Sequence, residues 1–191
     1  SVERYNAHLE TKIDVKDLQE DVDFAYQKLK NKQPDLDWFV PMHQLDFKFD
    51  SFRKAIQKPM KPIEFYHQFS QVVGEIGQAH TFLIPPMKKM TKKENKHYKE
   101  TIGPFSQLGI HFEPEFIVLT ANNSDDKSIL LGEKITHVNN HSVKDLYQKH
   151  SKTEYSDGYN KTFVENRMSR RFSHYFTLEY GIQDTLKLQF E

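Results

Sequence analysis

Apolar residues recur at helical spacing near the start of the chain. After a polar lead-in of about 13 residues, which the pattern predicts to be irregular, an apolar stripe follows at intervals of three and four. It consists of Leu18, Val22, Tyr26 and Leu29. This spacing puts the four side chains on one helical face, and Asp14 is placed to cap the helix. The sequence therefore predicts a helix over 15–30.

Two further helices are predicted before residue 80. One covers 45–57, and the next begins at Pro62, a favoured first helical residue. Their apolar positions, again three and four apart, are Phe49, Phe52 and Ile56 in the first and Phe65, Phe69, Val72, Val73 and Ile76 in the second. An aromatic stripe of this kind is typical of packing. We therefore assign Phe65 and Phe69 to the core and not to a ligand site.

After Pro104 the apolar period becomes that of β-strands. Residues 108–112 and 116–119 are short runs rich in β-formers, and 185–190 alternates between apolar and polar positions. Between them, Ile135 and Val138 are expected to pack, and Asn139 and Asn140 to form a turn. Short helices are expected from Val143 and over 161–175. The change of period predicts an α+β protein with a helical bundle-like domain over 1–87, a basic linker over 88–103, and a small β-rich domain over 104–191.

Composition and charge narrow the classes of function. The 27 basic residues balance the 27 acidic residues, so no overall field favours nucleic acid or an anionic membrane. Cysteine is absent, which excludes disulfides, thiolate nucleophiles and cysteine-ligated metals. No apolar run approaches the length of about 20 residues that a membrane span needs. The chain is also expected to lack a signal region, as if it were processed or trimmed.

The segment 74–86 contains the first candidate for chemistry. Gly77 is a plausible helix C-cap, and Phe82, Leu83 and Ile84 read as a short strand, so His80 lies on a tight joint between them. An imidazole has a pKa of about 6.5 and can act as a general base if a nucleophile comes within hydrogen-bond reach. The structural alternative is a histidine that interacts with the helix C-terminus.

Other patterns do not indicate cofactor chemistry. His137 and His141 are four residues apart, but they flank an Asn-Asn turn and no carboxylate sits beside them, so we predict no metal site there. The chain has neither a glycine-rich phosphate loop nor a Gly-x-Ser-x-Gly elbow. We therefore predict no cofactor.

Two segments together resemble a known family. The order of the helices leading to Ile76-Gly-Gln-Ala-His-Thr81 resembles the N-terminal helical region of bacterial C-terminal-processing (tail-specific) serine peptidases, the group that includes the tricorn core protease. The stretch from Leu131 to Val143 is similar to the Gly-Asp-x-Ile-x-x-Ile-Asn-Gly-x-x-Val stretch of their PDZ-like domains. Here glutamate replaces the aspartate, and Asn140 replaces the glycine.

The resemblance implies an activity and a set of roles. His80 would be the general base of a serine-type endopeptidase, while Ala79 stands where a family member can have an auxiliary serine. The PDZ-like domain would bind a polypeptide substrate or C-terminal peptide by strand addition, with Leu108, Gly109 and Ile110 at the carboxylate end of its groove. The family is bacterial and periplasmic or secreted. The nucleophile domain would follow Glu191, so we expect these 191 residues alone to be inactive.

Two other interpretations remain open. The chain could be a non-catalytic peptide-binding or assembly module, or a structural protein that keeps a vestigial histidine. A serine in a strand-to-helix turn beyond Glu191 would favour the peptidase. The sequence alone does not choose between them.

Overall fold

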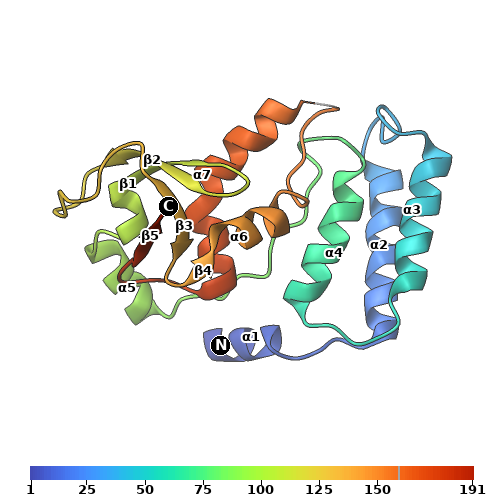
Figure 1. Ribbon diagram of the computed structural model, residues 1–191. Coiled ribbons are helices and arrows are strands. Elements are labelled where there is room, and N and C mark those ends of the chain that lie inside the picture. The colour runs from blue at the N-terminus through green and yellow to red at the C-terminus, as the bar shows by residue number, and fades with distance from the viewer. Residues whose placement is uncertain (159) are drawn as a thin grey trace. The chain divides into compact units, whose positions relative to one another are not determined.

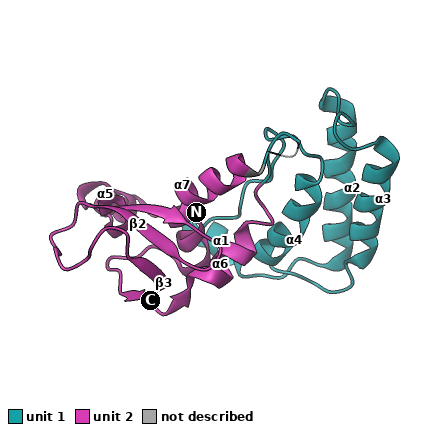
Figure 2. Cartoon of the chain, turned by 45° about the horizontal axis from the view of Figure 1, so that its top comes forward, with its two compact units in different colours: residues 1–89, 155–160 teal, residues 90–154, 161–191 magenta. Residues whose placement is uncertain are grey.

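The computed structural model describes residues 1–158 and 160–191 and divides them into two compact units (Figure 2). Unit 1 comprises Ser1–Lys89 and Tyr155–Asn160, and unit 2 comprises Met90–Glu154 and Lys161–Glu191. Helices dominate unit 1, and an antiparallel sheet with helices makes up unit 2 (Figure 1). The α+β class expected from the sequence is confirmed.

Unit 1 is built on three long amphipathic helices, α2 (Val15–Lys32), α3 (Met42–Ala55) and α4 (Pro62–Gly74). Each overlaps a helix predicted from apolar spacing. The prediction of an irregular lead-in was wrong, since helix α1 (Val2–Leu9) lies there, in a polar sequence that has no apolar stripe. It begins where the Ser1 hydroxyl accepts a hydrogen bond from the Arg4 N–H at 3.3 Å, an ordinary N-cap.

Aromatic rings form the centre of the unit 1 core. Tyr26 of α2 stacks on Phe49 of α3 with ring centroids 4.1 Å apart, and Phe49 meets Phe69 of α4 edge-on at 6.0 Å. Phe65 also contacts Phe69, at 5.2 Å. The assignment of Phe65 and Phe69 to packing is therefore confirmed. The core joins one aromatic stripe from each long helix.

Unit 2 contains the sheet. Its strands are β1 (Leu108–Phe112), β2 (Ile117–Asn122), β3 (Lys134–Val138), β4 (His141–Ser142) and β5 (Leu188–Phe190). The order is β1-β2-β3-β4 with β5 also paired to β3, and every pairing is antiparallel. A 3₁₀ turn, η1 (Pro104–Gln107), leads into β1. Within the described ranges, strand β1 therefore pairs only with β2.

Helices α6 (Val143–His150) and α7 (Lys161–Tyr180) complete the core of unit 2. Phe172 and Phe176 of α7 are fully buried, and Phe172 meets Phe112 of β1 edge-on at 4.9 Å. The register of β1 and β2 shifts between Gly109 and Ile110. This bulge brings Gly109 so close to Ala121 that an added Cβ would lie 2.8 Å from the Ala121 Cβ.

The segment predicted as a basic linker, 88–103, contains a helix. Helix α5 (Lys92–Glu100) belongs to unit 2, and no residue of it is buried. It forms because Thr91 and Glu94 make a capping box, which fixes a helix start even in a strongly polar stretch. Before it, Lys88 pairs with Glu10 at 3.0 Å within unit 1. In this part of the chain, unit 1 ends at Lys89 and unit 2 begins at Met90.

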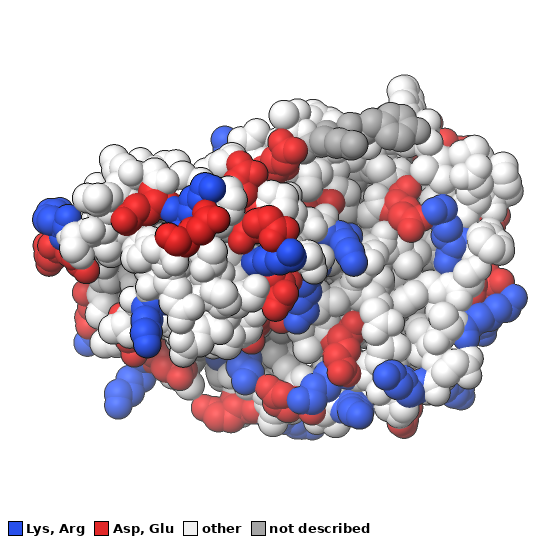
Figure 3. Space-filling model, in the orientation of Figure 1, with Lys and Arg blue, Asp and Glu red and all other residues white. Residues whose placement is uncertain are grey.

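The surface carries both signs of charge. On the face drawn in Figure 3, lysine and arginine side chains are interspersed with aspartate and glutamate, so a polyanion at this face would meet both signs. Among the described residues, no helix combines the length and the apolarity that crossing a membrane requires.

Candidate functional site

The joint that carries His80 is a series of tight turns after α4. The Gly77 N–H donates to the Gly74 carbonyl at 3.0 Å, and Gly77 takes the left-handed conformation, with φ at +72°. The Thr81 N–H then donates to the Gln78 carbonyl at 3.0 Å. The prediction of Gly77 as the helix C-cap was wrong, because α4 ends at Gly74 and Glu75 is its C-cap; the left-handed glycine belongs to the turn that follows. His80 thus sits in a turn whose backbone is held on both sides.

The strand predicted at Phe82–Ile84 is absent. Residues 81–86 carry no strand pairing, and Phe82 and Ile84 are exposed while Thr81 is buried. The prediction was wrong because a short apolar run with β-propensity describes an extended chain, whereas a strand also needs a partner. His80 therefore precedes an extended segment rather than a sheet.

A segment from far along the chain fastens this joint. The Asp157 carboxylate accepts a hydrogen bond from the Ala79 N–H at 2.8 Å, and the Gly158 N–H donates to the Gly77 carbonyl at 2.8 Å. Gly158 has φ at +59°, which glycine adopts without strain. We call residues 155–158 the clasp. Sequence reasoning missed it, although Ser-Asp-Gly is a turn signal that could have marked the segment.

The His80 side chain is exposed and makes no hydrogen bond or ion pair within the described part of the chain. Its neighbours in sequence are both constrained, so the imidazole projects from a fixed backbone while its ring remains accessible. Such a group can accept a proton from a hydroxyl brought to it. The described residues of unit 1 alone do not assemble a serine, histidine and carboxylate around it.

The three predicted peptide-binding residues lie on the end strand of the sheet. Leu108 and Ile110 turn their side chains into the unit 2 core, and Gly109 lies beside a bulge in β2, where Thr120 is the extra residue. Only their backbone is therefore available to a peptide. The Phe112 N–H points away from β2, since it donates to the Ser169 hydroxyl of α7 at 2.9 Å. Because backbone groups alternate along a strand, the N–H and C=O of Ile110 face the same unpaired edge.

Ser169 belongs to a short polar chain that the sequence gave no reason to expect. The Ser169 Oγ lies 3.4 Å from His111 Nδ1, and His111 Nε2 lies 2.9 Å from a Glu113 carboxylate oxygen. The hydroxyl is already engaged, since it accepts the Phe112 N–H and lies 3.3 Å from the Glu165 carbonyl. A serine bonded back to the preceding helical turn is a common helix feature. We assign Ser169 to holding α7 against β1.

A second polar cluster fixes the end of α6 to α7. The nearly buried Glu154 carboxylate accepts hydrogen bonds from Arg171 at 2.8 Å and from the Tyr175 hydroxyl at 2.6 Å, and it pairs with Arg167 at 2.6 Å. Burial, reinforced by the Glu154 charge, raises the pKa of Tyr175 far above its ordinary value. Two guanidinium groups thus neutralise one buried carboxylate. This arrangement is structural rather than catalytic.

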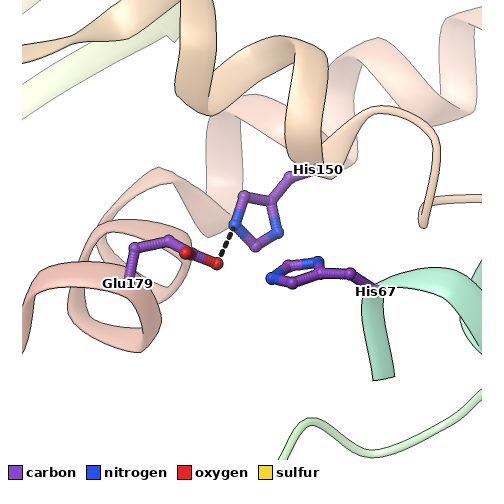
Figure 4. A group of neighbouring side chains, drawn as sticks. All are labelled: His67, His150 and Glu179. Carbon is purple, nitrogen blue, oxygen red and sulfur yellow. Dashed lines mark hydrogen bonds and ion pairs between the residues drawn. The ribbon is translucent and has the colours of Figure 1, made fainter. Parts of the chain in front are cut away.

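His150 lies next to that cluster. Its Nε2 is 3.1 Å from a carboxylate oxygen of Glu179, and both side chains are almost fully buried (Figure 4). The His150 ring stacks on Tyr175 with centroids 4.4 Å apart. The third side chain in that figure, His67, comes from α4 of unit 1. Within unit 2, the His150–Glu179 pair links the end of α6 to the end of α7.

The two histidines that we weighed as metal ligands occupy adjacent strands. His137 lies on β3 and His141 on β4, and the His141 ring stacks on Tyr180 at 3.6 Å. His137 Nδ1 lies 3.1 Å from the Thr136 hydroxyl. The stacked position of His141 is that of a packing residue, so the geometry adds nothing in favour of a metal site at this pair.

Comparison of the chain with protein-family models, with curated proteins and with solved structures finds no match.

Proposed function

We propose that unit 2 binds an extended peptide by strand addition at the unpaired edge of β1. The observation that carries this proposal is that β1 has β2 as its only strand partner among the residues that the structure describes, while the N–H and C=O of Ile110 face its other edge. An added strand satisfies such groups and gains affinity from main-chain hydrogen bonds. The ligand class is therefore a polypeptide in extended conformation, in agreement with the resemblance to PDZ-like domains.

The length of the available edge limits what the peptide can contact. Ser169 already accepts the Phe112 N–H, so pairing is confined to the part of β1 nearer η1. We infer that two or three peptide residues add to β1, with the polypeptide chain continuing past η1.

We further propose that His80 acts as the general base of a C-terminal-processing serine peptidase. The support is the resemblance, together with an exposed imidazole on a backbone turn held by the clasp. The base would remove the proton from a serine hydroxyl as that oxygen attacks the peptide carbonyl. That serine would come from outside the 191 residues. On the same resemblance the protein would be bacterial and periplasmic or secreted.

A titration tests strand addition. The probe is a soluble peptide of alternating threonine and valine, added to the ¹⁵N-labelled chain and followed by NMR. We expect saturable shifts of the amides of Leu108 to Phe112. Two further peptides carry N-methyl groups on alternate residues, one at the odd positions and the other at the even positions. One of them should no longer bind and the other should bind as before, because only one set of N–H groups faces β1. Shifts confined to other residues, or equal binding by both methylated peptides, would exclude the proposal.

A hydrolysis assay distinguishes the hypothesis of a peptidase from that of a non-catalytic binding module. An unfolded model protein is incubated with the full-length gene product, as wild type and as His80→Ala, with His97→Ala as a control on the exposed helix α5. A peptidase that uses His80 should lose about 10²-fold or more of its rate only in the first variant. Peptide binding without any hydrolysis would favour the binding module instead.

A further inference from the structure

A groove on unit 1 runs between α2 and the extended residues that follow His80. Its volume is about 290 Å³, and the apolar part of its lining comes from Ala25, Leu29, Val73 and Leu83, among others. These side chains belong to α2, α4 and the segment after the joint. The volume lies near the lower limit of small-molecule sites, about 300 Å³. The groove therefore suits a single short apolar chain.

One polar group in the lining has no partner. The Thr81 side chain is 8% exposed and lines the groove, and its hydroxyl makes no hydrogen bond within the described residues. Nearly all buried hydroxyls in proteins are hydrogen-bonded, because desolvation without a partner is costly. The Thr81 oxygen itself is buried, so the side chain must rotate about χ1 before an oxygen atom of a ligand in the groove can restore the missing bond.

Two cations border the same groove. Lys28 and Lys32 lie one turn apart on α2 and both contribute to the lining. Neither has a carboxylate partner among the described residues, although the Lys28 ammonium lies 5.2 Å from the centre of the Phe24 ring. Like charges at this helical spacing repel each other. No aspartate or glutamate lines the groove, so an anion placed between the lysines would meet attraction from both.

We propose that this groove binds an anionic amphiphile, namely a medium-length alkyl chain that ends in one carboxylate. The alkyl chain lies on Leu29, Val73 and Leu83, and the carboxylate lies near Lys28 and Lys32, where the Thr81 hydroxyl can donate to it once the side chain has rotated toward the groove. Apolar burial drives binding, and the lysines select the charged head group. This site is separate from β1 and does not depend on the peptide-binding proposal.

Decanoate below its micellar concentration is the probe, added to the whole ¹⁵N-labelled chain. We expect saturable amide shifts at Leu29, Val73 and Leu83. Lys28→Gln/Lys32→Gln should weaken binding about fivefold or more, because two attractive charges are lost. The control Lys92→Gln/Lys96→Gln removes a pair of the same spacing from α5 and should bind as the wild type does. Decanol should bind more weakly than decanoate.

A second variant tests the hydroxyl. Thr81→Val replaces an unpaired buried oxygen with a methyl group, so the fold should be retained, and decanoate binding should weaken about threefold. The proposal is overturned if the saturable shifts map away from the groove, if decanol binds as tightly as decanoate, or if the lysine variant keeps its affinity. Binding of a peptide at this groove with no binding of decanoate would also overturn it.

Discussion

Asp157 and Ala79 are separated by 78 positions in sequence, yet the carboxylate of one accepts the backbone N–H of the other at 2.8 Å. This bond fastens the clasp to the turn that presents His80. Through it, a segment that follows most of unit 2 in sequence becomes part of unit 1. The position of the candidate base thus depends on a residue far from it in the chain.

Removing the Asp157 acceptor should loosen this turn. We expect Asp157→Ala to lower the free energy of unfolding of unit 1 by about 1 kcal/mol, the usual contribution of such a hydrogen bond. The amides of Ala79 and His80 should also exchange faster with solvent. Asp157→Asn keeps an oxygen acceptor and should lower the free energy of unfolding by less. Asp125→Ala, on a loop of unit 2, is the control, and equal exchange in all variants would contradict the role of the clasp.

Gly109 should tolerate no side chain. A Cβ there would lie 2.8 Å from the Ala121 Cβ and 2.8 Å from the Thr120 Oγ1. We expect Gly109→Ala to destabilise unit 2 by about 1–3 kcal/mol, as overpacking does. Thermal unfolding measures the change. The matched control is Gly103→Ala, where nothing lies within 4 Å of the added carbon; an equal loss there would show that the bulge is not responsible.

Ser169 should stabilise the contact between α7 and β1. Ser169→Ala leaves the Phe112 N–H without its acceptor, and we expect a loss of about 1–2 kcal/mol in urea unfolding. Hydrogen exchange at Phe112 should accelerate in the same variant. Ser173→Ala removes an exposed hydroxyl one turn further along α7 and should change neither quantity. Unchanged exchange at Phe112 in Ser169→Ala would argue against this assignment.

His174 should make unit 2 sensitive to mild acid. Burial lowers the pKa of His174, and the charges of Arg171 and His150 lower it further, while Glu154 opposes them. The unfolded state, with a pKa of about 6.5, then binds more protons than the folded state. The contribution of uncharged His174 to the stability of unit 2 is therefore complete above about pH 6.5. It decreases as the pH falls toward the lowered pKa of His174 in the folded state.

The measurement is the free energy of unfolding between about pH 7 and pH 5. His174→Gln removes the titrating group and should flatten the profile, whereas His97→Gln, on the exposed helix α5, should leave the wild-type slope. A profile that stays equally steep in His174→Gln would assign the acid sensitivity to another group.

Local periodicity determined the main helices, the β1 strand and the packing role of Phe65 and Phe69. It did so because burial of one face imposes a spacing that can be read directly from the sequence. The left-handed Gly77 was predictable for a similar local reason, since few other residues adopt that backbone conformation readily. Periodicity did not predict helices α1 and α5, because these helices have capping residues but no apolar stripe.

Only the tertiary structure decided which distant segments meet. The short apolar run at 82–84 suggests an extended chain, but no pattern within it reveals whether another strand lies alongside. The bond from Ala79 to Asp157, the contact of Ser169 with β1, and the groove beside Thr81 each join residues that are far apart in sequence. Such contacts depend on how whole elements pack, which local propensity does not encode.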